Sequence, residues 1–181
     1  MIHVGSQIIV NCTTLQEFKL GTKKLMTIED ARNSFAKKVI QSLHAKDETA
    51  QSLGISIDAA GMRWCKINMV VRDDMVNGHA VAHGGFIFTL ADTAMAYASN
   101  GENHQTLAQH CQITFISPGK QGEILVATAR EVSRTNRNGL FDVEVRGENE
   151  RLIAAFRGAT RTIKGQTDPD LGEAPKTIWA N

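Results

Sequence analysis

The sequence has little cysteine, little proline and almost no excess charge, and each shortage excludes a class of protein. Its 3 cysteines lie far apart and form no CxxC pair, which excludes a disulfide framework and favours a reducing, cytoplasmic location. With 3 prolines and 42% hydrophobic residues, the chain is neither collagen-like nor largely disordered. The formal net charge is only +1, so the sequence lacks the excess of cationic residues that typically binds the phosphates of nucleic acid. No apolar run approaches the roughly 18 residues that span a bilayer, so we expect no nucleic-acid and no membrane partner.

The length of 181 residues fits one domain with short extensions. Residues 1–25 follow no clear period and lack the basic and apolar regions of a signal peptide. We interpret them either as an extension or as the product of an upstream start, with the domain beginning near Met26. Thr27 and Asp30 then have the spacing of a capping box, and apolar residues recur every three to four positions after it. We therefore expect an N-terminal amphipathic helix at the start of a single domain, residues 26–164, followed by a loose C-terminal tail, residues 165–181.

Most of the remaining chain alternates between apolar and polar residues, which predicts β-strands. In the first of them, Trp64 lies on one face and Ile67 and Met69 lie on the other. Turn residues such as Asn138-Gly139 separate the later strands at intervals of about ten residues, which indicates an antiparallel meander. The expected strands cover residues 62–71, 107–116, 124–132, 140–145 and 151–163.

Residues 84–100, GGFIFTLADTAMAYASN, interrupt this alternation. The segment contains no proline, is rich in alanine and is apolar on nearly every side, so we expect a long helix that must be buried. A single buried helix wrapped by an antiparallel sheet is the plan of the hotdog fold. The sequence therefore predicts an α+β protein with this architecture.

Asp92 is the one charged residue in that apolar segment. An ionised carboxylate in apolar surroundings lowers stability by several kcal/mol unless it is paired with a cation or hydrated. One interpretation is a structural carboxylate, satisfied by a backbone N–H or by an arginine from a neighbouring strand. The other is a general base or nucleophile whose basicity is tuned by its surroundings, and this interpretation ranks Asp92 first among the candidate catalytic residues.

His83, Gly84 and Gly85 stand where this helix begins. Two glycines and the unpaired N–H groups of a first helical turn suit an oxyanion or a polarised carbonyl, whereas the alternative is a tight turn that simply needs glycine. Asp92 lies eight residues after Gly84, about 12 Å along the helix axis. Both residues can act on one substrate only if they come from two chains with antiparallel helices. Shared chemistry therefore predicts at least a dimer.

Four segments carry a longer signature: NGHAVAHGGFIFTLADTAMAYA at 77–98, ITFISPG at 113–119, NGLFDVEV at 138–145 and AAFRGATRTI at 154–163. Together they resemble the PaaI-type acyl-CoA thioesterases of the hotdog superfamily, over roughly residues 45–163. The resemblance implies an enzyme that hydrolyses thioesters of coenzyme A, typically with aromatic acyl groups such as phenylacetyl. It implies no metal and no cofactor beyond the CoA of the substrate, and a homotetramer built from two dimers.

The resemblance also implies roles for individual residues. The backbone N–H of Gly84 would bind the thioester carbonyl, and Asp92 of the partner subunit would attack that carbonyl or activate water. His83 would orient the thioester, Asn77 would lie near the reacting carbonyl, and Thr93 would hold the water or the carboxylate. The candidate contacts for the pantetheine and phosphates of CoA are Asn138, Gly139, Arg134 and Arg137.

Two positions depart from the family pattern. Lys46-Asp47 stands where relatives often carry Asn-Asp, and Ser117 stands where they often carry Arg, which leaves the acyl-chain preference open. The alternative function is a non-catalytic acyl-CoA-binding module that senses a ligand. An enoyl-CoA hydratase on the same fold would need a different Asp/His pairing, which we do not find.

Three further residues are weaker candidates for chemistry. His79 and His83 have a spacing that suits a metal on a helix, but they precede the helix and no third ligand has helpful spacing. We therefore expect no metal site. Cys111 lies in the middle of an expected strand with alternating neighbours, which predicts a core position.

Overall fold

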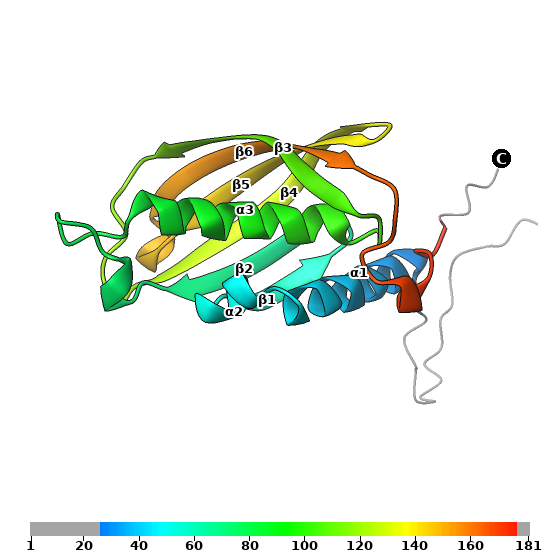
Figure 1. Ribbon diagram of the computed structural model, residues 1–181, viewed down its shortest axis with the longest axis horizontal. Coiled ribbons are helices and arrows are strands. Elements are labelled where there is room, and N and C mark those ends of the chain that lie inside the picture. Colours follow the sequence, from blue (N-terminus) through cyan, green and yellow to red (C-terminus); the bar gives the residue numbers. More distant parts are fainter. Residues whose placement is uncertain (1–25, 177–181) are drawn as a thin grey trace, which may run out of the picture.

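The computed structural model describes residues 26–176, which form the α+β hotdog architecture expected from the sequence (Figure 1). An antiparallel sheet curves around one long helix, α3 (Gly84–Asn100), whose bounds are those of the predicted helix. The predicted extension, residues 1–25, and the end of the predicted tail, residues 177–181, lie outside the described residues.

Six strands form the sheet. They are β1 (Ser56–Gly61), β2 (Trp64–Val70), β3 (Thr106–Phe115), β4 (Ile124–Thr135), β5 (Asn138–Arg146) and β6 (Leu152–Thr162). Their order is β1-β2-β4-β5-β6-β3, so β4, β5 and β6 form the predicted meander. The prediction is wrong for β3, which among the described strands pairs only with β6, at the edge opposite β1. The reason is that α3 carries the chain across the concave face before β3 begins (Figure 1).

Two elements were missed by the sequence patterns. The helix α2 (Glu48–Ser52) has 5 residues, too few to show a helical period, and Asp47 caps its N-terminus by accepting a hydrogen bond from Ala50 N–H (3.0 Å). In β1, a bulge between Ile57 and Ala59 shifts the register against β2 and interrupts the alternation.

The hairpin between β4 and β5 turns earlier than predicted. Thr135 pairs with Asn138, so the turn consists of Asn136 and Arg137 rather than of Asn138-Gly139. Asn136 adopts the left-handed backbone conformation, with φ 53°, that two-residue hairpin turns require. Asn138 and Gly139 instead begin β5.

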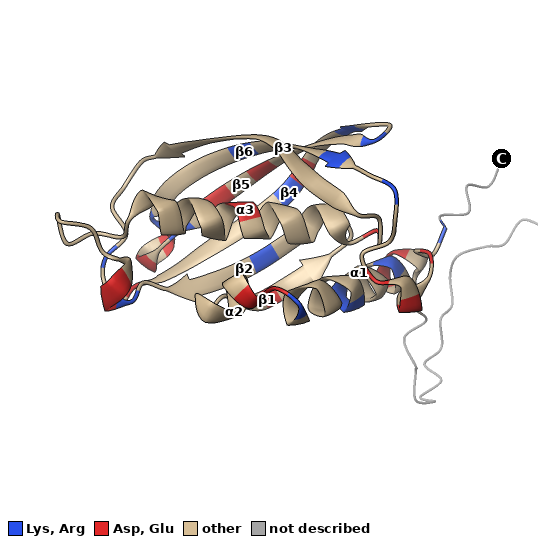
Figure 2. Ribbon diagram, viewed as in Figure 1, with Lys and Arg blue, Asp and Glu red and all other residues tan. Residues whose placement is uncertain are grey.

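The helix α3 is buried because its apolar side chains meet the apolar concave face of the sheet. Leu90 and Met95 are fully buried in one core cluster with Ile67 and Met69, which share one face of β2 as predicted. Figure 2 shows that α3 is uncharged over most of its length, and its one charged residue is Asp92. Although α3 is apolar, no helix within residues 26–176 is long and apolar enough to cross a membrane.

The predicted N-terminal helix is α1 (Ile28–Ala45), which lies beside β1 (Figure 1). Its capping box is present as predicted: the hydroxyl of Thr27 accepts a hydrogen bond from the N–H of Asp30, and the carboxylate of Asp30 accepts one from the N–H of Thr27, both 3.0 Å. The buried face includes Val39 and Ile40, which pack toward β1 and α3.

The first part of the predicted tail is held against the domain. The side-chain amide of Asn103 donates hydrogen bonds to the carbonyl oxygens of Asp168 (2.8 Å) and Gly172 (2.6 Å). Its Oδ1 accepts a hydrogen bond from the N–H of Asp168 (2.8 Å). Residues 165–172 are therefore tied to the segment after α3 and are not loose, a connection between distant residues that composition alone does not reveal.

Candidate active site

The helix α3 begins with an open hydrogen-bond donor. His83 caps the helix: its Nδ1 accepts a hydrogen bond from Gly85 N–H (3.1 Å), and its carbonyl oxygen accepts one from Phe86 N–H (3.0 Å). The N–H of Gly84 makes no hydrogen bond within residues 26–176 and lies at the positive end of the helix dipole. This N–H is therefore available to a carbonyl oxygen or an oxyanion.

A cleft of about 440 Å³ opens beside Gly84, and Asn77, Phe115 and Ser117 also line it. A Cβ on Gly84 would lie 2.9 Å from the ring of Phe115, so glycine permits this ring to pack against the start of the helix. The side-chain oxygen of Asn77 accepts a hydrogen bond from the N–H of His79 (2.9 Å), which fixes the loop before the helix. The structure thus brings together two predicted site residues, Asn77 and Gly84. Ser117, which stands where relatives often carry Arg, lines the same cleft.

Asp92 is half-buried in the middle of α3 and has no arginine partner within the described residues. Its Oδ1 accepts a long hydrogen bond from the thiol of Cys111, with a sulfur-to-oxygen distance of 3.8 Å. Burial raises the pKa of Asp92, and the Cys111 hydrogen bond lowers it by a smaller amount, so the net pKa lies above its ordinary value. A carboxylate shifted in this direction is a stronger base, which suits proton abstraction or nucleophilic attack.

Cys111 packs against the hydrophobic core, in line with the predicted core position, but it is half-buried rather than fully buried and also contacts Asp92. The residue is half-buried on β3, where its thiol faces Asp92 on α3. Burial, and next the negative charge of Asp92, raise the pKa of Cys111 to about 11, so the group is a thiol that can donate a hydrogen bond. Strand alternation indicates that Cys111 points inward, but it does not indicate which helical residue the side chain meets.

Gly84 and Asp92 do not converge within one subunit. They lie on the same continuous helix, eight residues apart, which corresponds to about 12 Å along its axis. Thr93 follows Asp92 and is also half-buried. The single chain therefore presents two separate halves of a site, one at the N-terminus of α3 and one at its centre.

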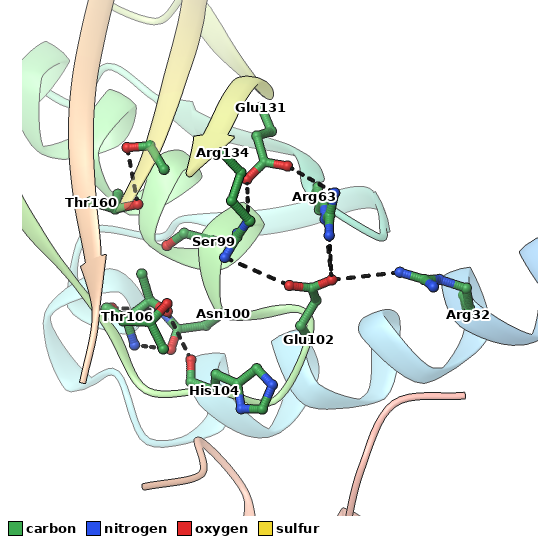
Figure 3. Close-up of polar contacts among 12 residues, drawn as sticks. Arg32, Arg63, Ser99, Asn100, Glu102, His104, Thr106, Glu131, Arg134 and Thr160 are labelled. Carbon is green, nitrogen blue, oxygen red and sulfur yellow. Dashed lines mark hydrogen bonds and ion pairs between the residues drawn. The ribbon is translucent and has the colours of Figure 1, made fainter. Parts of the chain in front are cut away.

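The predicted CoA contacts lie toward the other end of α3. Arg134 is engaged in a network of ion pairs: its Nε donates a hydrogen bond to Glu131 (2.6 Å), and its Nη1 lies 3.7 Å from Glu102, which follows α3 (Figure 3). Arg63 joins the same two glutamates, at 2.8 Å from Glu102 and 3.3 Å from Glu131. Arg134 is thus bound to neighbouring carboxylates in this subunit.

The other three CoA candidates lie in the adjacent hairpin. Arg137 and Asn138 are exposed, whereas Gly139 is buried in β5. A Cβ on Gly139 would lie 2.8 Å from the hydroxyl oxygen of Thr160, so packing within the sheet is enough to require glycine there. The structure does not bring these residues to Gly84 of the same chain.

The histidines that precede α3 are both exposed, and the described residues contain no group of three or more histidine, cysteine, aspartate or glutamate side chains arranged to hold a metal ion. His83 contacts the helix start as its cap, and His79 contributes a backbone N–H to the loop.

Comparison with known proteins identifies relatives by both sequence and fold. The thioesterase superfamily model matches residues 79–154. The chain is 37% identical to the acyl-coenzyme A thioesterase PaaI of Escherichia coli (strain K12) over 131 residues, which cover 71% of this chain and 94% of that protein. It is also similar to the solved structure of the E. coli PaaI protein from the phenylacetic acid degradation operon, with a TM-score of 0.74 and 34% identity over 75% of this chain and 98% of that one.

A second solved structure, a mutant of the phenylacetic acid degradation protein PaaI from Thermus thermophilus, gives a TM-score of 0.62 and 32% identity. That match covers 65% of this chain and 100% of the other. Sequence identity and fold therefore agree over nearly the whole length of these relatives. The chain belongs to the PaaI-type acyl-CoA thioesterases of the thioesterase superfamily.

Proposed function

We propose that the protein hydrolyses aromatic acyl-CoA thioesters of the phenylacetyl type to the free acid and CoA, with Asp92 as the base or nucleophile. The observation that carries this proposal is a half-buried carboxylate without a cationic partner in the described residues, on an otherwise apolar helix. Such a group costs stability, which argues for a chemical role. The aromatic acyl group is supported by the two solved relatives, which are named for phenylacetic acid degradation.

The complete site requires a second copy of the chain. The strand β3 forms an edge of the sheet and exposes Leu107 (58%) and Phe115 (52%). A second subunit that adds along β3, with its α3 antiparallel to the first, would bring Gly84 of one subunit toward Asp92 of the other and cover these apolar side chains. A pair of such dimers would form the tetramer implied by the family resemblance.

In this arrangement the N–H of Gly84 donates a hydrogen bond to the thioester carbonyl oxygen and stabilises the negative charge that develops on it. Asp92 either takes a proton from the attacking water or attacks the carbonyl carbon itself, forming an anhydride that water then hydrolyses. In both routes the C–S bond breaks, CoA leaves as a thiolate that gains a proton, and the acyl group leaves as the carboxylic acid. His83 and Asn77 orient the thioester, and Thr93 holds the water or the carboxylate.

A thiol-release assay tests the proposal with phenylacetyl-, benzoyl-, short-chain and long-chain acyl-CoA. We expect Asp92→Asn to lower turnover at least about a hundredfold, the scale of a lost general base. Asp170→Asn, an exposed acid-to-amide change far from α3 in sequence, is the matched control and should keep wild-type turnover. Near-normal hydrolysis by Asp92→Asn would refute the role of Asp92. A folded wild-type protein that binds acyl-CoA without releasing thiol would favour the ligand sensor.

A further inference from the structure

A second groove, of about 400 Å³, lies at the C-terminal half of α3, separate from the cleft at Gly84. Its volume is in the range of small-molecule sites. Helices α1 and α3 form part of its wall, the start of β3 and the residue after β6 form another part, and Asp47, Gln105 and Thr167 complete it. The residues that matter for its chemistry are Leu43, Asp47, Ala96, Tyr97, Leu107 and Ile163.

The groove begins one helical turn from Asp92. Ala96 lies four residues after Asp92, so the two side chains share a face of α3, about 6 Å apart along its axis. Cys111 on β3 contacts Asp92, and Leu107, which lies earlier in the same strand, lines the groove. For a substrate whose carbonyl carbon lies at Asp92, the groove therefore lies one helical turn away, toward the C-terminal end of α3.

Most of the surface of the groove is apolar, but Asn100, Gln105, Thr106 and Thr167 also line it, and a hydrogen-bonded polar group lies where α1 ends. The hydroxyl of Tyr97 donates a hydrogen bond to Oδ2 of Asp47 (3.1 Å) and lies 2.9 Å from Nδ1 of His44. Since the single hydroxyl hydrogen points to Asp47, the His44 ring must donate its Nδ1–H to Tyr97. Tyr97 is 1% exposed, and its burial raises its pKa, so it stays a hydroxyl.

Asp47 supplies the charge at this position. It is the one charged residue among those that line the groove, and its other oxygen accepts the capping hydrogen bond from Ala50 N–H (3.0 Å). These two bonds leave acceptor capacity on the carboxylate and no cation against it within the groove lining. An acyl group that ends in a carboxylate would place a second negative charge beside Asp47, and the repulsion between the two like charges would disfavour binding.

We propose that this groove binds the acyl group of the substrate and that Asp47, held by Tyr97 and His44, excludes acyl groups that end in a carboxylate. The proposal rests on the proposed function, because it places the reacting carbonyl at Asp92. The apolar walls gain by covering an uncharged acyl group, and Asp47 makes the groove unfavourable for dicarboxylic acyl-CoA such as glutaryl-CoA.

Filling the groove tests its occupant. Ala96→Leu adds volume at its wall on a helix that tolerates leucine, and we expect the ratio of kcat/KM for phenylacetyl-CoA to that for acetyl-CoA to fall at least about tenfold. Ala45→Leu, an exposed position at the end of α1, adds the same volume outside the groove and should keep the wild-type ratio. An unchanged ratio in a folded Ala96→Leu protein would show that the acyl group lies elsewhere.

Removing the charge tests the selection. Asn can keep the helix cap at position 47, so Asp47→Asn should fold, as a thermal melt by circular dichroism will verify. We expect wild type to prefer hexanoyl-CoA over glutaryl-CoA, two acyl groups of similar length, and Asp47→Asn to reduce this preference at least about tenfold. Equal preference in both proteins would refute the role of Asp47. A wild type that hydrolyses no thioester would refute the proposed function, whereas hydrolysis with unaltered ratios in both variants would refute only the groove.

Discussion

Glu123 offers a quantitative test of how the loop beside the cleft is held. Its side chain is buried, with 2% of the residue exposed. One carboxylate oxygen accepts hydrogen bonds from Glu148 N–H and from Arg151, both 2.7 Å, and the other accepts from Lys120 N–H and Arg151, both 2.8 Å. We expect Glu123→Gln to destabilise the protein, because the amide keeps one acceptor oxygen and turns an NH₂ group toward donors.

The size of the loss follows from these bonds. Hydrogen bonds to a charged group are worth about 1.5–3 kcal/mol each, and two of them end on the oxygen that the substitution removes. Arg151 keeps some contact with water, with 30% of its side chain exposed, so its share is reduced. We therefore expect the free energy of unfolding to fall by about 3 kcal/mol, the lower end of the range for breaking a buried ion pair.

The assay is equilibrium unfolding in urea at fixed protein concentration, for wild type, Glu123→Gln and the control Glu144→Gln. Glu144 forms an exposed ion pair with Arg146, so its loss should cost less than about 1 kcal/mol. A loss below about 1 kcal/mol for Glu123→Gln as well would refute the reasoning, since the buried carboxylate would then contribute no more than an exposed one.

The pH dependence gives an independent check on Glu123. Burial raises its pKa, but the hydrogen bonds from Lys120, Glu148 and Arg151 together outweigh burial, and the net pKa lies below its usual value. A carboxylate with a lowered folded pKa contributes stability above its unfolded pKa of about 4.3, and this contribution is lost as the pH falls through the folded value. The difference between wild type and Glu123→Gln should therefore be full at neutral pH and shrink in acid. A difference that does not change with pH would contradict this account.

Two further predictions concern the carboxylate at the centre of α3. The thiol of Cys111 lowers the pKa of Asp92, so Cys111→Ala should raise this pKa and move the acid limb of the kcat/KM profile to higher pH. Cys111→Ser keeps a hydrogen-bond donor and should move the limb less. A limb that does not move in Cys111→Ala would exclude this hydrogen bond from catalysis. Because burial raises the folded pKa of Asp92, the ionised carboxylate destabilises the fold at any pH above its unfolded pKa. Asp92→Asn should therefore melt at a higher temperature than wild type at neutral pH, but not at pH 3. A lower melting temperature of Asp92→Asn at neutral pH would contradict this prediction.

The central helix was predictable because its signals are local. An unbroken apolar stretch, alanines and two glycines at its start define residues 84–100, and the structure places the helix at those bounds. The capping box of Thr27 and Asp30 is equally local and is present in the structure. By contrast, the position of β3 at the far edge depends on the path that α3 takes across the sheet before β3 begins. The alternation of residues within a strand carries no information about that path.

The candidate site was predictable by residue type more than by neighbourhood. Asp92 stands out in the sequence because a charge in an apolar helix is expensive, and the structure shows it half-buried with a raised pKa. Two contacts join residues from different elements: the hydrogen bond between Cys111 and Asp92, and the hydrogen bond from Tyr97 to Asp47. Such contacts follow from packing, so neither periodicity nor spacing could reveal them.

The two halves of the candidate site are built in different ways, and the difference bears on the proposal that two chains share one site. At the Gly84 end, the cap by His83 and the packing of Phe115 fix a backbone N–H whose position depends on no side chain of its own. At the Asp92 end, a carboxylate is left with one weak hydrogen bond from a thiol. A fold that satisfied Asp92 with an arginine would lower its pKa and weaken it as a base. The donor and the carboxylate lie about 12 Å apart on one rigid helix, which prevents them from neutralising one another, and in the proposed site a second helix, running antiparallel, places both on the same thioester.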